Sequence, residues 1–140
     1  MPVTLPQNHV PSPAPSLPRR RFRAADVAVQ LDMVVIGDIC VGVSLAGYRT
    51  VVGGFLNDES GSQATLLRAL DAANAAALPR LAHAVKGAAA SLGLRAMQAL
   101  AHRVETDGAG YSAVDCSDAA AALRDRLDTT RALLDRMGFV

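Results

Sequence analysis

The sequence lacks tryptophan altogether and has only two cysteines among its 140 residues. Cys40 and Cys116 stand alone, without the CxxC spacing of zinc ligands or the cysteine density of a disulfide-stabilised domain. The sequence therefore predicts neither a disulfide framework nor a metal site, and it favours a reducing, cytoplasmic compartment. Aromatic residues make up only 4% of the chain and hydrophobic residues 51%. Much of that share is alanine and leucine in the second half, which favours closely packed helices.

An excess of charge of either sign is also lacking. The formal net charge is +1, so no strongly basic or acidic field predicts nucleic acid as a partner. The basic cluster at residues 19–21 adjoins a proline-rich stretch, and we interpret it as the solvated end of a linker. The longest apolar run, residues 33–48, is interrupted by Asp38 and by glycines and is too short to span a bilayer. Without a signal-peptide pattern either, the sequence predicts a soluble protein.

The chain divides into an arm and one folded domain. Six of the seven prolines lie before residue 19, which predicts a disordered, proline-rich arm or linker over residues 1–21. Residues 22–140 then form a single domain. The β-branched residues around 34–41 would suit a strand, but no second strand-like run is present for pairing. A short N-terminal helix over about residues 24–41 is therefore expected.

From Leu45 onward, apolar residues recur at spacings of three and four, which is typical of amphipathic helices. A first long helix over about 45–70 has a polar middle at residues 57–62, where a kink is expected. The other expected boundaries are Pro79 to Gly93 for the next helix, a turn at 107–110 after the fourth, and Ser117-Asp118 to Gly138 for the last. These helices predict an all-α fold, an antiparallel four-helix bundle with an additional short N-terminal helix.

The helix expected after Pro79 has two faces of different kinds. At about 100° per residue, His83, Lys86, Gly87 and Ala90 share one side. The opposite side carries an apolar stripe that predicts the core, made of Leu78, Leu81, Ala82, Val85, Ala89 and Leu92. A lone histidine on a helix is usually a tolerated surface residue. A stripe with one imidazole, one ammonium and two nearly bare positions is nevertheless unusual for a solvated face.

The residue types in this stripe favour one kind of chemistry. An exposed neutral imidazole is a nucleophile near neutral pH. Lys86, one turn on, can neutralise phosphoryl oxygens, and Gly87 leaves room for a partner to approach the ring. No carboxylate flanks His83 on this helix face to act as a base, and the chain has no glycine-rich phosphate loop. The helix is therefore expected to hold a phosphoryl group without catalysing its transfer alone.

The stretch from Ala82 to Gly93, AHAVKGAAASLG, resembles the signature A-H-x-[LIV]-K-G-x-x-x-x-[LIV]-G of histidine phosphotransfer (HPt) domains. The similarity covers roughly residues 31–137. It continues to Val104-Glu105, where the family often has a leucine–glutamate pair. The resemblance implies a domain that takes a phosphoryl group from a receiver-domain aspartate and passes it to another receiver in a two-component phosphorelay.

The resemblance also implies individual roles. His83 would be the phosphoacceptor, Lys86 the stabilising cation and Gly87 the point of access for a receiver. Pro79, Arg80 and Ala90 are expected beside Gly87 on the docking surface. The receiver would supply the aspartate and Mg²⁺, so the chain itself is expected to be no enzyme and to need no cofactor or metal. The implied partners are response-regulator receivers and a hybrid sensor histidine kinase, with this chain either freestanding or the kinase's last domain.

Two other classes of function have weaker support in the sequence. A helical interaction module could bind a receiver or kinase without being phosphorylated, but such a module would not need the imidazole of His83. An autonomous histidine kinase needs a nucleotide-binding domain, for which 140 residues leave no room. The oligomeric state stays open, since residues 33–52 are apolar enough to permit self-association.

Overall fold

A computed structural model of the chain describes residues 24–140, with side chains described from Val27 onward. All regular elements in this range are helical, and no strand occurs within it. In chain order the helices are α1 (Ala24–Gln30), α2 (Met33–Val43), α3 (Leu45–Asn57), α4 (Ser62–Asp71), α5 (Leu78–Leu92), α6 (Arg95–Asp107) and α7 (Ala113–Arg136). Two short 3₁₀ turns, η1 (Ala75–Ala77) and η2 (Gly108–Gly110), precede α5 and follow α6. The expected arm at residues 1–21 lies outside the described residues.

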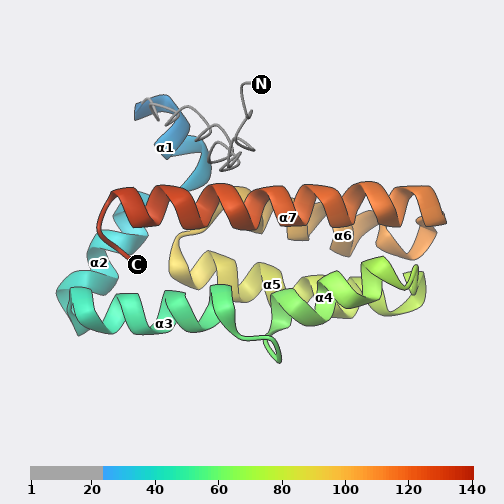
Figure 1. Ribbon diagram of the computed structural model, residues 1–140, viewed down its shortest axis with the longest axis horizontal. Helices are drawn as coiled ribbons and strands as arrows, with labels where there is room; N and C mark the ends of the chain where they lie inside the picture. The colour runs from blue at the N-terminus through green and yellow to red at the C-terminus, as the bar shows by residue number, and fades with distance from the viewer. Residues whose placement is uncertain (1–23) are drawn as a thin grey trace, which may run out of the picture.

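Four long segments run in alternating directions along the molecule (Figure 1). α3 and α4 lie nearly end to end and form the first of these segments, followed by α5, α6 and α7. α2 crosses one end of the bundle, and α1 packs against α6. The prediction of an all-α antiparallel bundle is therefore confirmed.

The core fills the space between these segments with aliphatic side chains. One buried polar contact ties two of them together, because the Tyr48 hydroxyl on α3 donates a hydrogen bond of 2.9 Å to the carbonyl oxygen of Leu92 at the end of α5. Burial raises the pKa of Tyr48 to about 12, so the hydroxyl stays protonated and keeps donating. The ring of Tyr48 also packs edge-on against Phe139, at a centroid distance of 5.6 Å. α3, α5 and the end of the chain thus meet at one residue.

The prediction of one continuous N-terminal helix over residues 24–41 is wrong. The structure has two helices, α1 and α2, separated at Leu31 and Asp32. The Asp32 carboxylate accepts hydrogen bonds from the backbone N–H groups of Val34 and Val35 and caps a new helix. Leu31 is buried, and the Asp32 N–H bonds to the Gly93 carbonyl at 2.8 Å. This contact with the α5–α6 connection fixes the break.

The expected kink at residues 57–62 is a complete interruption. The Asp58 side chain accepts hydrogen bonds from the backbone N–H and the hydroxyl of Ser60, at 2.9 and 2.7 Å. The Gly61 N–H bonds to the Asp58 carbonyl, which closes a turn between α3 and α4. A local side-chain turn has replaced the helical hydrogen bonds here.

The start predicted for the last helix is also wrong. α7 begins at Ala113, with Ser112 as its N-cap, and Ser117 lies inside the helix. Ser112 and Asp115 form a reciprocal capping box, in which each side chain accepts the other's backbone N–H. Two satisfied donors at this earlier position outweigh the capping tendency of Ser117-Asp118.

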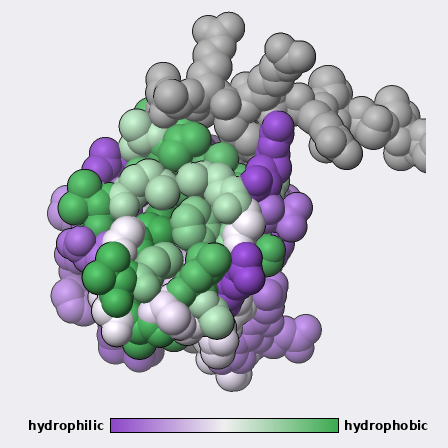
Figure 2. Space-filling model, turned by 90° about the vertical axis from the view of Figure 1, so that its left-hand side faces the viewer, coloured by the Kyte–Doolittle hydropathy of each residue, from purple (hydrophilic) through white to green (hydrophobic). Residues whose placement is uncertain are grey.

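The end of the molecule formed by α2 and the start of α3 is apolar on its surface (Figure 2). Val34 is 74% exposed and Val41 is 91% exposed, and Val43 and Leu45 are exposed beside them. In spite of this apolar surface, none of the helices described is both long and apolar enough to cross a membrane.

Candidate functional site

The local sequence explains where α5 begins and ends. Pro79 lies in its first turn, where the missing N–H costs little, as predicted. Gly93 ends the helix in the left-handed conformation, with a φ of 74°. A Cβ on Gly93 would lie 2.8 Å from the carbonyl oxygen of Asp32 and 2.8 Å from a side-chain carbon of Ile36. Glycine is therefore required here both for its φ and for the close approach of α2.

The two faces of α5 are arranged as the helical spacing predicts. Leu78, Ala82, Val85 and Ala89 are completely buried. On the opposite face His83 and Gly87 are exposed, whereas Lys86 and Ala90 are partly buried. Of the other two residues expected at the docking surface, Pro79 is partly buried and Arg80 is exposed. They precede His83 by one helical turn, so all six residues lie along one side of α5.

The neighbouring helix α6 brings a carboxylate to this side. Oε1 of Glu105 lies 2.7 Å from Nδ1 of His83, and Oε2 of the same carboxylate lies 2.5 Å from Nζ of Lys86. Glu105 therefore bridges two residues that are one turn apart on α5. The side chain of His83 is 71% exposed and that of Glu105 is 25% exposed. The ring thus projects into solvent while one edge is held by the carboxylate.

Hydrogen bonds keep Glu105 ionised. The Lys86 ammonium, and after it the His83 ring, lower the pKa of the Glu105 carboxyl below its usual value of 4.5. An ionised carboxylate can only accept hydrogen bonds, so Nδ1 of His83 must be the donor in this contact. In the neutral imidazole the proton then resides on Nδ1, and Nε2 carries the free lone pair.

The sequence of α5 predicts no carboxylate beside His83. This prediction is wrong for the folded protein, because Glu105 reaches the ring from α6. Glu105 is 22 residues away in the sequence and on a different helix, so the periodicity of α5 could not reveal it. The available signal was the Val104-Glu105 pair in the family resemblance. Val104 is buried in the core, which places Glu105 at the edge of the interface between α5 and α6.

No group of three or more histidine, cysteine or acidic side chains capable of holding a metal occurs within the described part of the chain. Cys40 and Cys116 are both free thiols.

Comparison with known proteins agrees with the motif. The model of the Hpt domain family matches residues 51–133, which is more than half of the chain and includes all of α4, α5 and α6. Neither a curated protein nor a solved structure gives a significant match. Hpt domains are phosphocarrier modules rather than catalysts, and they interact with receiver domains. The chain belongs to the Hpt domain family, whose members carry phosphoryl groups on histidine in two-component phosphorelays.

Proposed function

We propose that this protein accepts a phosphoryl group on Nε2 of His83 from the aspartyl phosphate of a receiver domain and passes it to a second receiver. The observation that carries the proposal is the contact between Nδ1 of His83 and Glu105, on an imidazole that is 71% exposed. One ring nitrogen is held inside the site, and the other is presented to solvent. An arrangement of this kind suits a nucleophile whose reaction partner belongs to another molecule.

In the forward transfer, the Nε2 lone pair attacks phosphorus of the receiver's aspartyl phosphate. The N–P bond forms as the P–O bond to the aspartate breaks, and the aspartate leaves as a carboxylate. No proton has to be removed from the attacking nitrogen, because the proton of the neutral ring is on Nδ1. The site therefore needs no general base, and this agrees with a carrier that relies on its partner for catalysis.

Glu105 has a second effect after the transfer. A ring with phosphorus on Nε2 and a proton on Nδ1 carries a positive charge, as does an imidazolium. The Glu105 carboxylate lies 2.7 Å from that Nδ1 and stabilises the charge without a change in protonation. Glu105 is thus a positioning residue that acts through the ring and does not touch the phosphoryl group.

Lys86 is the cation that neutralises phosphoryl oxygens in the proposal. It is one turn from His83, and its ammonium is held by Glu105 at 2.5 Å before any phosphoryl group arrives. Its side chain is 28% exposed, so a flexible stem can carry the ammonium toward a group on Nε2. The three residues together keep the charges of the site close to balanced before and after transfer.

The surface around His83 is proposed as the docking site for the receiver. A Cβ added to Gly87 would meet no atom within 4 Å, so the space beside the histidine is open. Ala90 continues this low surface along α5, while Pro79 and Arg80 border it on the other side. A receiver that encloses His83 would supply the aspartate and its Mg²⁺, and the metal would neutralise the phosphoryl charge during transfer.

The remaining assignments are proposals of the same kind. The phosphoryl group would derive from a hybrid sensor histidine kinase, and the compartment would be the cytoplasm, where receivers operate and free thiols stay reduced. The chain itself would need no cofactor of its own.

The test is a transfer assay with a receiver whose aspartate carries radiolabelled phosphate. Label should move to this protein and should be acid-labile and alkali-stable, as expected for phosphohistidine. His83→Gln should remove the labelling, and His102→Gln, which alters another exposed histidine on α6, should not. Label that persists in the His83→Gln protein would contradict the proposal.

A further inference from the structure

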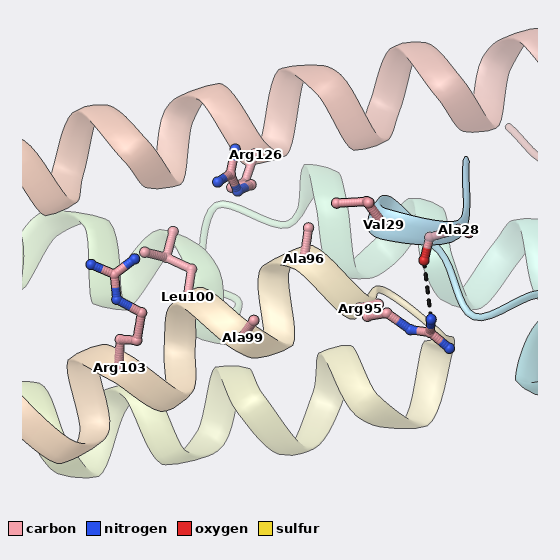
Figure 3. Close-up of a pocket in the computed structure, with 8 residues that line it drawn as sticks. All are labelled: Ala28, Val29, Arg95, Ala96, Ala99, Leu100, Arg103 and Arg126. Atoms are coloured by element: carbon pink, nitrogen blue, oxygen red, sulfur yellow. Dashed lines mark hydrogen bonds between the residues drawn. The ribbon is translucent and has the colours of Figure 1, made fainter. Parts of the chain in front are cut away.

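A second surface feature lies on the side of α6 that faces away from His83. It is a groove of about 570 Å³ between α1, α6 and α7 (Figure 3). Arg103 precedes Glu105 by two residues, so at about 100° per residue the two side chains leave α6 in nearly opposite directions. An occupant of the groove would therefore leave His83 and its docking face free.

The groove combines an apolar floor with a positive rim. Ala96, Ala99 and Leu100 form the floor along α6, and Ala28 and Val29 of α1 close one end. Three arginines border it, with Arg95 and Arg103 from α6 and Arg126 from α7 (Figure 3). Small side chains on the floor leave room for another backbone to approach α6 closely.

The three arginines differ in how well they are paired. Arg95 bonds to the carbonyl oxygen of Ala28 at 3.1 Å and to the Asp32 carboxylate at 3.3 Å. Arg126 contacts a carboxylate oxygen of its sequence neighbour Asp125 at 3.4 Å, and Arg103 forms no hydrogen bond or ion pair with any described residue. The groove thus has one arginine paired beside α1, one that contacts its sequence neighbour Asp125, and one, Arg103, without an ion pair among the described residues.

The end of the groove at Arg95, where α1 lies on α6, shows what kind of segment would fit the remaining part of the groove. α1 packs on α6 as a helix, and the carboxylate that pairs with Arg95 belongs to Asp32, the N-cap of α2, two residues after the end of α1. A second helical segment laid further along α6 would meet the same surface of small apolar side chains and then Arg103 and Arg126. Acidic residues beside an apolar stripe on that segment would pair with the two arginines.

The chain's own N-terminal arm is a poor candidate for this place. Its sequence has arginine at positions 19, 20, 21 and 23, and no acidic residue occurs before Asp26. Arginines on the arm would repel those at the rim. Charge complementarity therefore favours a segment from another protein.

We propose that this groove is a docking site for an amphipathic helix of a partner protein, with an apolar stripe on the floor and carboxylates paired with Arg103 and Arg126. Such a site goes beyond the phosphotransfer and does not require it. It would tether a partner to the back of α6 while His83 exchanges phosphoryl groups at the other side.

The test uses the full chain labelled with ¹⁵N and a synthetic helical peptide with a leucine–alanine stripe flanked by glutamates. Backbone amide signals of Ala99, Leu100, Arg103 and Arg126 should shift on titration, and those around His83 should not. A peptide with lysine in place of each glutamate should cause no shift. Added salt should weaken the binding of the acidic peptide.

Matched variants test whether Arg103 and Arg126 at the rim of the groove contribute to peptide binding. The double variant Arg103→Gln/Arg126→Gln should weaken the peptide about tenfold, as expected for the loss of two solvent-exposed charge pairs. Arg68→Gln/Arg124→Gln removes the same charge from side chains that bond elsewhere, to the Glu59 carbonyl and the Asp71 carboxylate, and should leave affinity unchanged. Melting curves of both double variants establish that they fold.

Several results would overturn the proposal. The first is that the amide signals of the groove do not shift when the acidic peptide is added. The second is that the lysine peptide shifts them equally. The third is that Arg68→Gln/Arg124→Gln weakens peptide binding as much as Arg103→Gln/Arg126→Gln. Groove signals that depend on protein concentration without peptide would assign the groove to a second copy of this chain. Shifts reproduced by octanoate and lost with the rim arginines would assign it to a small apolar anion. Since the readout is binding at α6, its failure leaves the proposed phosphotransfer untouched.

Discussion

Oε1 of Glu105, on α6, lies 2.7 Å from Nδ1 of His83, on the preceding helix α5. Packing between α5 and α6 thus decides which ring nitrogen faces Glu105 and leaves Nε2, the nitrogen proposed to react, exposed. The same carboxylate holds Lys86 at 2.5 Å, so a single acidic residue positions both the imidazole and the ammonium that we propose act on the phosphoryl group.

Glu105→Gln should slow phosphoryl acceptance at His83. The amide can donate a hydrogen bond to Nδ1, which favours the tautomer with the proton on Nε2 and blocks the lone pair needed for attack. Loss of a partner that orients a metal-bound imidazole typically costs about 10- to 100-fold in activity, and we expect an effect of that order for the free imidazole of His83. The rate of transfer from a phosphorylated receiver measures the effect.

The matched readout for Glu105→Gln is ¹⁵N NMR of the His83 ring. It should report Nδ1 protonated in the wild type and a shift toward protonated Nε2 in the variant. Glu105→Asp keeps the charge with a shorter stem and should retain more activity than the amide. An unchanged tautomer together with a slowed rate would mean that Glu105 acts in another way.

Lys86→Ala should have a modest effect on the phosphorylated protein. A partly exposed charge pair is worth about 1 kcal/mol or less, which corresponds to about fivefold or less in rate or equilibrium. Acceptance should slow, or loss of the phosphoryl group should speed up, within that factor, and Lys86→Arg should retain most of the wild-type behaviour. A thousandfold effect in the transfer assay would assign Lys86 a different role.

The free energy of unfolding should depend on pH through the ionisation of the Glu105 carboxyl. Hydrogen bonds from Lys86 and then His83 depress its pKa below 4.5, so the folded state binds this proton less readily than the unfolded chain. The stabilisation is present above the ordinary pKa of 4.5 and is lost as the pH falls through the lower, folded value. Urea unfolding of the wild type and Glu105→Gln should therefore differ near neutral pH and converge in acid. A difference that grows as the pH falls would contradict this sign.

Two glycines on α5 and at its end should respond in opposite directions to the same change. Gly93→Ala adds a Cβ 2.8 Å from a backbone oxygen at a φ of 74° and should cost about 2 kcal/mol. Gly87→Ala adds a Cβ that meets nothing within 4 Å inside a helix and should stabilise by up to about 1 kcal/mol. Chemical denaturation of the two variants measures both changes in the free energy of unfolding. Destabilisation by Gly87→Ala would contradict the open space found beside Gly87.

The sequence predicts those parts of the structure that depend on residues close together in the chain. The face with His83, Lys86 and Gly87 follows from helical spacing alone, as do the end of α5 at Gly93 and the place of Pro79 in its first turn. Glu105 could not be found this way, because its contact with His83 depends on how α6 packs on α5. The break between α1 and α2 cannot be predicted for the same reason, since the Asp32 N–H bonds to the distant Gly93 carbonyl.

The start of α7 is a local feature that the sequence did contain. Ser112 accepts a hydrogen bond from the Asp115 N–H at 3.1 Å, and Asp115 accepts one from the Ser112 N–H at 3.0 Å. Ser117 is equally suited to capping by residue type, but it is exposed within the helix and follows the capping box. The two serines therefore make a matched pair for a test of where the helix begins.

Ser112→Ala should destabilise the protein by about 1 kcal/mol, because it leaves an N-terminal N–H of α7 without its acceptor. Ser117→Ala should be neutral or slightly stabilising, since alanine is the better residue inside a helix. Urea unfolding gives both free energies, and Asp115→Asn tests the other half of the box. If Ser117→Ala were the costly change and Ser112→Ala the neutral one, α7 would begin at the later position.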